Sequence, residues 1–360
     1  MTAFPDLRLK RARLDTYGRP DVPELVDRYG RVARDLRISV TDRCNLRCQY
    51  CMPEEGQEFL PTPEVLTDDE IIRLMRIAVD ELRIEEIRFT GGEPLMRKSL
   101  EKLVAAARGM TAWTGAPLDL SLTTNGLGLK HRARGLAEAG LNRVNVSMDT
   151  VSPQAYAALT RRNRLKDAQA GAAAAAEAGM TPVKLNALVM PGVNENGVCD
   201  LLQYALEHHY ELRFIEFMPL GPRGTWKRSQ MVTREDILRI VEQHFELTHR
   251  PGPERGASPA EEWDVLPGTN HPGGRFGIVA SVSRPFCGEC DRTRLTADGQ
   301  LRSCLFAREE TDLRALLRGG ASDTEIADTW RAAMWGKQAG HGIDDPGFLS
   351  PARPMSAIGG

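Results

Sequence analysis

The sequence predicts an α/β fold of six β/α units, followed by a C-terminal region of a different kind. Two observations support this fold class. First, six short segments rich in β-branched or aromatic residues alternate with six longer segments whose apolar residues recur at helical spacing. This alternation indicates a parallel sheet with right-handed crossovers. Second, the alternation stops near residue 250. Since a complete TIM-type barrel needs eight units, the expected fold is an incomplete (β/α)6 barrel.

The expected strands are recognised by β-branched and aromatic residues that recur within a few positions. They cover residues 36–40, 86–89, 118–123, 143–148, 183–189 and 212–217. The helices between and after them are expected over residues 67–82, 100–107, 129–139, 165–178, 195–208 and 234–245. Thr67 and Glu70 form a capping-box pattern where the first helix begins. In a barrel of this type, the chemistry is expected at the C-terminal ends of the strands.

The two ends of the chain differ from the barrel, which is assigned to residues 35–250. Residues 1–34 are polar, arginine-rich and interrupted by prolines, and they are interpreted as a mobile extension or an arm. Residues 251–360 are interpreted as a separate C-terminal region. Its expected parts are a long loop over 251–275, a strand over 276–283, a hairpin turning at Asp298-Gly299, a helix over 323–335, and a tail over 341–360 without structure of its own.

Composition excludes several classes of protein. Lysine and arginine number 47 and aspartate and glutamate 49, so the net charge is −2. A protein that coats nucleic acid would be strongly basic, so no nucleic-acid partner is expected. No apolar run approaches the roughly 18 residues of a membrane span, and the N-terminal segment lacks the apolar core of a signal peptide. A cytoplasmic location is therefore expected.

The seven cysteines cannot all be paired within one chain, because their number is odd. Six of them form two triplets, C-x₃-C-x₂-C and C-x₂-C-x₁₃-C, made of Cys44, Cys48 and Cys51, and of Cys287, Cys290 and Cys304. Cys199 stands alone in an expected helix and is interpreted as a buried thiol. Closely spaced thiolates suit a soft metal centre, and three ligands leave one coordination position open. For the second triplet, zinc with His249, His271 or His341 as fourth ligand is an equal alternative.

Two motifs carry a resemblance to a known family. The segment CNLRCQYC contains the first triplet, and FTGGEP follows the second expected strand. Both resemble the signatures of radical S-adenosylmethionine (SAM) enzymes. The second triplet, the R-x-R segment after it and the terminal Gly359-Gly360 resemble the GTP 3′,8-cyclase family, and this resemblance extends from about residue 35 to the C-terminus.

The resemblance implies a lyase with two [4Fe–4S] clusters, one on each cysteine triplet. The first cluster would bind SAM, and Tyr50, Gly92, Ser147 and Met218 match SAM contacts of the family. The implied reaction converts GTP to (8S)-3′,8-cyclo-7,8-dihydroguanosine 5′-triphosphate, the first step of molybdenum cofactor (molybdopterin) biosynthesis. A 5′-deoxyadenosyl radical from SAM would start this reaction by removing the 3′ hydrogen of GTP.

The second cluster, by the same resemblance, binds the guanine base of GTP. Arg292 and Arg294 lie on one face of an extended segment, where two forked guanidinium groups suit a triphosphate. The positions that match GTP contacts of the family are Arg37, Arg88, Thr123, Lys184, Arg292, Thr293 and Arg294. Gly359 and Gly360 match a tail that the family inserts into its active site, so they are grouped with Arg292 and Arg294 as catalytic residues.

The implied partners are GTP, a second copy of the chain, an external electron donor and a cyclic pyranopterin monophosphate synthase that takes the product. Neither nucleic acid nor a membrane is among them. Two alternatives remain open: a radical SAM enzyme that modifies a peptide with the help of an auxiliary cluster, and a metal-binding scaffold without catalysis.

Overall fold

The structure of the protein is a computed structural model, which describes residues 10–12, 14–221, 226–249, 256–346, 348–351 and 353–359. These residues pack into two compact units. The first unit consists of the described parts of 1–44, 58–120 and 290–360, and the second consists of those of 45–57 and 121–289. In this part of the chain, no helix combines the length and the apolar character that crossing a membrane requires.

The first unit contains a sheet in which strands from the two ends of the chain are neighbours. Its strands, in spatial order, are β1 (Lys10–Arg11), β15 (Glu309–Asp312), β14 (Gln300–Arg302), β13 (Arg292–Leu295), β4 (Asp35–Ser39) and β5 (Glu86–Thr90). Strands β13, β4 and β5 are parallel. Strands β13 and β14 form the expected hairpin, and Gly299 has the positive φ of 75° that its turn requires.

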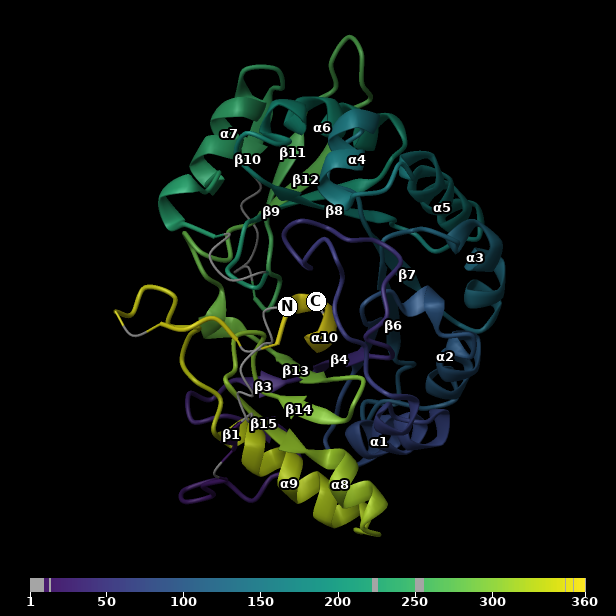
Figure 1. The fold of residues 1–360 in the computed structure, drawn as a ribbon, viewed down its shortest axis with the longest axis vertical. Coiled ribbons are helices and arrows are strands. Elements are labelled where there is room, and N and C mark those ends of the chain that lie inside the picture. Colours follow the sequence, from purple (N-terminus) through teal and green to yellow (C-terminus); the bar gives the residue numbers. More distant parts are fainter. Residues whose placement is uncertain are drawn as a thin grey trace. The chain divides into compact units, whose positions relative to one another are not determined.

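The helices of the first unit follow the predicted pattern, with two additions. They are α1 (Asp68–Asp80), α2 (Leu100–Arg108), α8 (Leu313–Arg318), α9 (Asp323–Trp335) and α10 (Met355–Ile358), with 3₁₀ turns at Thr62–Glu64 and Pro94–Met96. The predicted capping box of α1 is confirmed. Helices α8 and α9 pack against β14 (Figure 1). Neither α8 nor α10 was predicted, because both are shorter than the window in which helical periodicity shows.

Residues 25–33 form a packed hairpin, so the expectation of a mobile extension is wrong for this part of the segment. Strands β2 (Leu25–Val26) and β3 (Val32–Ala33) form a small hairpin, and Leu25 is fully buried. The Arg31 guanidinium forms a buried ion pair with Asp27 and donates to the carbonyls of Gln338 and Ala339. The two carbonyl partners belong to the C-terminal region of the chain, so the composition of residues 1–34 alone cannot reveal these contacts.

The C-terminal tail is also held in place. Arg353 donates to both carboxylate oxygens of Asp298, at 2.8 and 2.7 Å, and lies 3.2 Å from a carboxylate oxygen of Glu310. Beyond it, α10 buries Ile358. The tail, which was expected to have no structure of its own, is ordered in its described part by long-range ion pairs, and these replace the local order that its sequence lacks.

The second unit carries the remaining strands of the predicted alternation. In spatial order they are β6 (Asp119–Thr124), β7 (Arg143–Ser147), β8 (Lys184–Val189), β9 (Glu211–Glu216), β12 (Gly274–Val279), β11 (Glu261–Val265) and β10 (Leu247–His249). Strands β6 to β9 are parallel to one another, and β12 is parallel to β9. Strands β10, β11 and β12 form an antiparallel meander. The expected loop over 251–275 therefore contains β11 and the start of β12. The ring of Trp263 stacks on Phe276, a pairing that a count of prolines and glycines could not predict.

The helices of the second unit are α3 (Leu129–Glu138), α4 (Pro153–Thr160), α5 (Leu165–Glu177), α6 (Val198–Glu207) and α7 (Arg234–Glu242). Short 3₁₀ turns lie at Glu195–Gly197, Arg228–Gln230 and Cys287–Glu289. The alanine-rich run of α5 allows close packing on the segment before α3: a Cβ on Gly171 would lie 2.4 Å from the Gly126 carbonyl oxygen. Helix α4 was not predicted, and it supports the first cysteine loop.

Candidate functional site

A row of arginines crosses the sheet of the first unit. Arg294 on β13 pairs in register with Arg37 on β4, which in turn pairs with Arg88 on β5. Side chains at partner positions of neighbouring strands project from the same face of the sheet. Arg292, two residues before Arg294, projects from that face as well. The structure thus brings together the four arginines that the sequence singled out, and we call these four residues the arginine row.

The arginine row is desolvated and shares one carboxylate, that of Asp35. Arg292 and Arg294 are 7% and 6% exposed. The Asp35 carboxylate lies 3.3 Å from Arg37 and 3.6 Å from Arg292. Burial raises the pKa of Asp35, but the charges of the arginine row outweigh burial and hold it below its usual value. Burial, together with repulsion from Arg37 and Arg292, lowers the pKa of Arg294. Positive charge concentrated in this way suits a polyanion.

Thr293 does not join the arginine row through its side chain. It lies between Arg292 and Arg294 on β13, so its hydroxyl faces the opposite side of the sheet. There it accepts a 3.0 Å hydrogen bond from the indole of Trp330 on α9, and both residues are fully buried. The Thr293 side chain therefore faces away from the arginine row, and only its backbone is available for the predicted contact with GTP.

Two thiols of the second triplet lie beside the arginine row. The Cys290 sulfur lies 4.0 Å from the Arg292 guanidinium. Burial lowers the pKa of Arg294, and Cys304 and Cys290 are close enough to oppose this effect. The Lys337 ammonium lies 3.4 Å from the Cys290 sulfur. Burial raises the pKa of the Cys290 thiol, but the charges of Lys337 and Arg292 outweigh it, so this pKa lies below its usual value. These surroundings favour the thiolate, the form that binds metals.

The described part of the C-terminal tail ends at the arginine row. The Gly359 carbonyl accepts a 2.8 Å hydrogen bond from Arg294. Figure 1 shows the α10 segment beside β13 and β4. A Cβ on Gly359 would lie 2.6 Å from the Thr90 hydroxyl oxygen, and the φ of +76° favours glycine. The structure therefore places Gly359 next to Arg294. Gly360 lies outside the described residues, and the catalytic role of both glycines stays a prediction.

A second polar row crosses the sheet of the other unit. Thr123 on β6, Asn145 on β7, Lys184 on β8 and Glu211 on β9 occupy partner positions of successive strands. The Lys184 ammonium lies 2.8 Å from the Glu211 carboxylate. Sequence reasoning singled out Thr123 and Lys184 but missed Asn145, which is 2% exposed. The sequence signal that could have revealed Asn145 is a polar residue between Val144 and Val146 in a predicted buried strand.

The loop of the first cysteine triplet is attached to α4. The backbone N–H groups of Arg47 and Gln49 donate to the carbonyls of Thr160 and Leu159, at 3.1 and 2.9 Å. From the end of the same helix, the Arg161 guanidinium donates to the carbonyls of Arg47 and Met52. Helix α4 thus holds the backbone around Cys48 and Cys51 in one conformation.

Tyr50, a predicted SAM contact, is hydrogen-bonded to the carboxylate of Asp149, a residue that sequence reasoning missed. Its hydroxyl donates to Asp149 at 2.8 Å, and the N–H of Leu188 donates to the other oxygen of that carboxylate. Burial raises the pKa of Asp149 to about 6. The predicted contacts Ser147 and Met218 lie where expected, at the last residue of β7 and just beyond β9.

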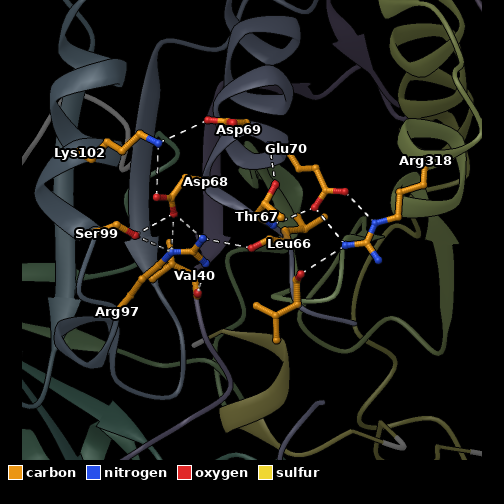
Figure 2. A network of polar contacts seen from close by, with 11 residues as sticks. Val40, Leu66, Thr67, Asp68, Asp69, Glu70, Arg97, Ser99, Lys102 and Arg318 are labelled. Carbon is orange, nitrogen blue, oxygen red and sulfur yellow. Dashed lines mark hydrogen bonds and ion pairs between the residues drawn. The ribbon is translucent and has the colours of Figure 1, made fainter. Parts of the chain in front are cut away.

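Gly92 follows β5 and is required by the packing of the chain itself. A Cβ there would lie 2.5 Å from the Arg43 carbonyl oxygen, and the Gly92 N–H donates to Thr41. Further along this loop, Arg97 donates to the Val40 carbonyl at the end of β4 and to Asp68 in the first turn of α1 (Figure 2). This network fixes the chain immediately before Cys44.

The donor chemistry of both triplets fits iron–sulfur clusters, because all six cysteines are free, partly exposed thiols. Each triplet is divided between the two units, with Cys44, Cys290 and Cys304 in the first. Within either described unit, no three metal-binding side chains gather at one point. That each triplet converges on one cluster therefore stays a prediction. Cys199 on α6 is half-buried, and burial raises its pKa to about 11, as expected for an inert thiol.

Comparison with known proteins finds two families along the chain. The Radical SAM superfamily matches residues 38–205, and Molybdenum Cofactor Synthesis C matches residues 210–343. The chain is 60% identical over 336 residues to the GTP 3′,8-cyclase of Streptomyces coelicolor, covering 93% of this chain and 96% of the relative. It is 57% identical to that of Corynebacterium glutamicum, with coverage of 93% and 89%, and 56% identical to that of Mycolicibacterium smegmatis, with coverage of 93% and 92%.

Among solved structures, the chain is similar to Streptococcus suis SuiB. The two align with a TM-score of 0.56 and 14% identity, over 86% of this chain and 68% of SuiB. SuiB bound to S-adenosylmethionine aligns with a TM-score of 0.55. At this identity the likeness shows the fold alone, and it confirms the predicted incomplete (β/α)6 barrel.

Proposed function

The chain belongs to the GTP 3′,8-cyclase family of radical SAM enzymes, and from this premise we propose which of its residues perform the reaction. The family uses SAM and iron–sulfur clusters. We assign one [4Fe–4S] cluster to Cys44, Cys48 and Cys51, and the second to Cys287, Cys290 and Cys304. The observation that carries the assignment is the position of the arginine row beside Cys290, whose sulfur lies 4.0 Å from the Arg292 guanidinium. This contact joins a site for a polyanion to the second triplet.

On the first triplet, a reduced cluster with bound SAM supplies the one-electron chemistry that starts the reaction. The role of the chain there is positioning. Helix α4 fixes the loop around Cys48 and Cys51. Tyr50, held by Asp149, together with Gly92, Ser147 and Met218, is assigned to SAM. These residues follow or end their strands, where a barrel enzyme keeps its reacting groups.

For GTP, the arginine row is assigned to the triphosphate. A guanidinium group can donate two parallel hydrogen bonds to one phosphate group. Such charge-assisted hydrogen bonds are strongest where water is excluded. Thr123 and Lys184, with the backbone of Thr293, are assigned to the rest of the nucleotide. Gly359, whose carbonyl accepts a hydrogen bond from Arg294, and Gly360 are assigned to the same catalytic group as Arg292 and Arg294. Dimerisation, an external electron donor and transfer of the product to a cyclic pyranopterin monophosphate synthase belong to the same proposal.

The reaction is tested with the anaerobically reconstituted holoenzyme, SAM, a reductant and GTP deuterated at C3′. We expect 5′-deoxyadenosine to form in a GTP-dependent manner and to carry deuterium from C3′. ATP serves as the control and should not replace GTP. If 5′-deoxyadenosine formed at the same rate without GTP, or carried no deuterium, the assigned substrate position would be wrong.

Gly359→Ala is expected to reduce GTP turnover by at least about tenfold. The added Cβ would clash with Thr90 and Ser39, and the left-handed backbone would add about 1–2 kcal/mol of strain. Gly320→Ala is the matched control, because Gly320 has a φ of +81° but open space around it. Turnover and iron content are measured for both variants. Equal turnover in the two would contradict a role for the tail.

A further inference from the structure

Lys337 is a buried cation that neither the motifs nor the assigned roles explain. It lies just beyond the end of α9 and is 3% exposed. Its ammonium donates to the Cys290 carbonyl at 2.9 Å, to the Arg292 carbonyl at 2.9 Å and to the Cys290 sulfur at 3.4 Å. An ammonium group has three N–H donors, and these three acceptors account for all of them.

The charge of Lys337 needs a counter-ion, because an unpaired charge is costly to bury. Among the residues that the structure describes, no carboxylate lies within ion-pair distance of this ammonium. The Cys290 sulfur lies 3.4 Å away, within hydrogen-bond distance of the ammonium. The position of Lys337 therefore suits a cysteine sulfur that binds a metal, because a metal-bound cysteine carries negative charge.

From this geometry we infer that Lys337 is a positioning residue of the second cluster, donating a charge-assisted hydrogen bond to its Cys290 ligand and raising the reduction potential of that cluster. The inference rests on the proposed assignment of Cys290 as a ligand. Hydrogen bonds and positive charge near a cluster sulfur stabilise the reduced, more negative form. The two carbonyl bonds of Lys337 also fix the backbone from Cys290 to Arg292, so one side chain connects the cluster ligand to the arginine row.

The test compares Lys337→Met, which keeps the length and loses the charge, with wild type and with the exposed control Lys130→Met. Each substitution is made in a chain whose first triplet is replaced by alanine, so that only the second cluster is reduced. We expect about four irons per chain in all three proteins. At a fixed solution potential, the ratio of reduced to oxidised cluster should fall at least tenfold in Lys337→Met, a shift of about 59 mV for one electron. An unchanged ratio with full iron content overturns the inference.

A second measurement does not depend on how the variant folds. Wild-type holoenzyme containing ¹⁵N-lysine is reduced and examined by pulsed electron paramagnetic resonance. We expect a lysine ¹⁵N coupling to the second cluster, and its absence overturns the inference. If the chain with only the second triplet instead bound no iron, the ligand assignment itself would fail, which is a different outcome from an unchanged potential.

Discussion

Replacing Cys290 with alanine is expected to lower the iron content of the reconstituted protein from about eight atoms per chain to about four. Turnover of GTP should then be lost, because the substrate site loses the group beside the arginine row. Cys48→Ala should give the same iron content, but it should abolish cleavage of SAM as well. Iron and sulfide analysis, combined with detection of 5′-deoxyadenosine, separates the two variants.

Cys199→Ala is the matched control for these substitutions. Its thiol is half-buried and lies 3.6 Å from the Ile240 carbonyl oxygen, apart from both triplets in the sequence. We expect full iron content and full turnover from this variant. Loss of iron from Cys199→Ala, or retention of about eight irons by Cys290→Ala, would contradict the assignment of the six cysteines to two clusters.

Loss of Arg294 is expected to weaken GTP binding by about 10- to 100-fold, because a hydrogen bond to a charged group contributes about 1.5–3 kcal/mol. Replacing Arg292 as well should weaken binding further. The dissociation constant of GTP is measured anaerobically at fixed ionic strength, because salt screens such contacts. Guanosine tests the phosphate role directly, since its binding should not change in these variants.

Arg134→Ala is the control for the arginine variants, because its side chain is 91% exposed on α3. It should bind GTP as wild type does. If the Arg294→Ala protein bound GTP with wild-type affinity, or lost affinity for guanosine to the same extent, the arginine row would not be a triphosphate site.

Much of the barrel could be predicted from local patterns. The strands β4 to β9 and the helices between them have periodic sequences long enough to recognise, and the capping box of α1 lies within four consecutive residues. The cysteine motifs and FTGGEP are equally local. Helix α4, by contrast, has only eight residues, and its importance comes from the cysteine loop attached to its C-terminal end. Contacts between distant segments leave no trace in a short sequence window.

The sequence by itself determined the α/β alternation, the two cysteine triplets and the residue types that bind a triphosphate. Only the tertiary structure placed Arg294, Arg37 and Arg88 in one row, because strand register depends on which strands become neighbours. The same holds for Lys337, 47 positions after Cys290, and for the tail anchored by Arg353 on Asp298. Apolar periodicity is a property of consecutive residues, whereas the pairing of buried charges depends on the whole fold. The incomplete barrel could therefore be predicted, but the contacts that adjust its chemistry could not.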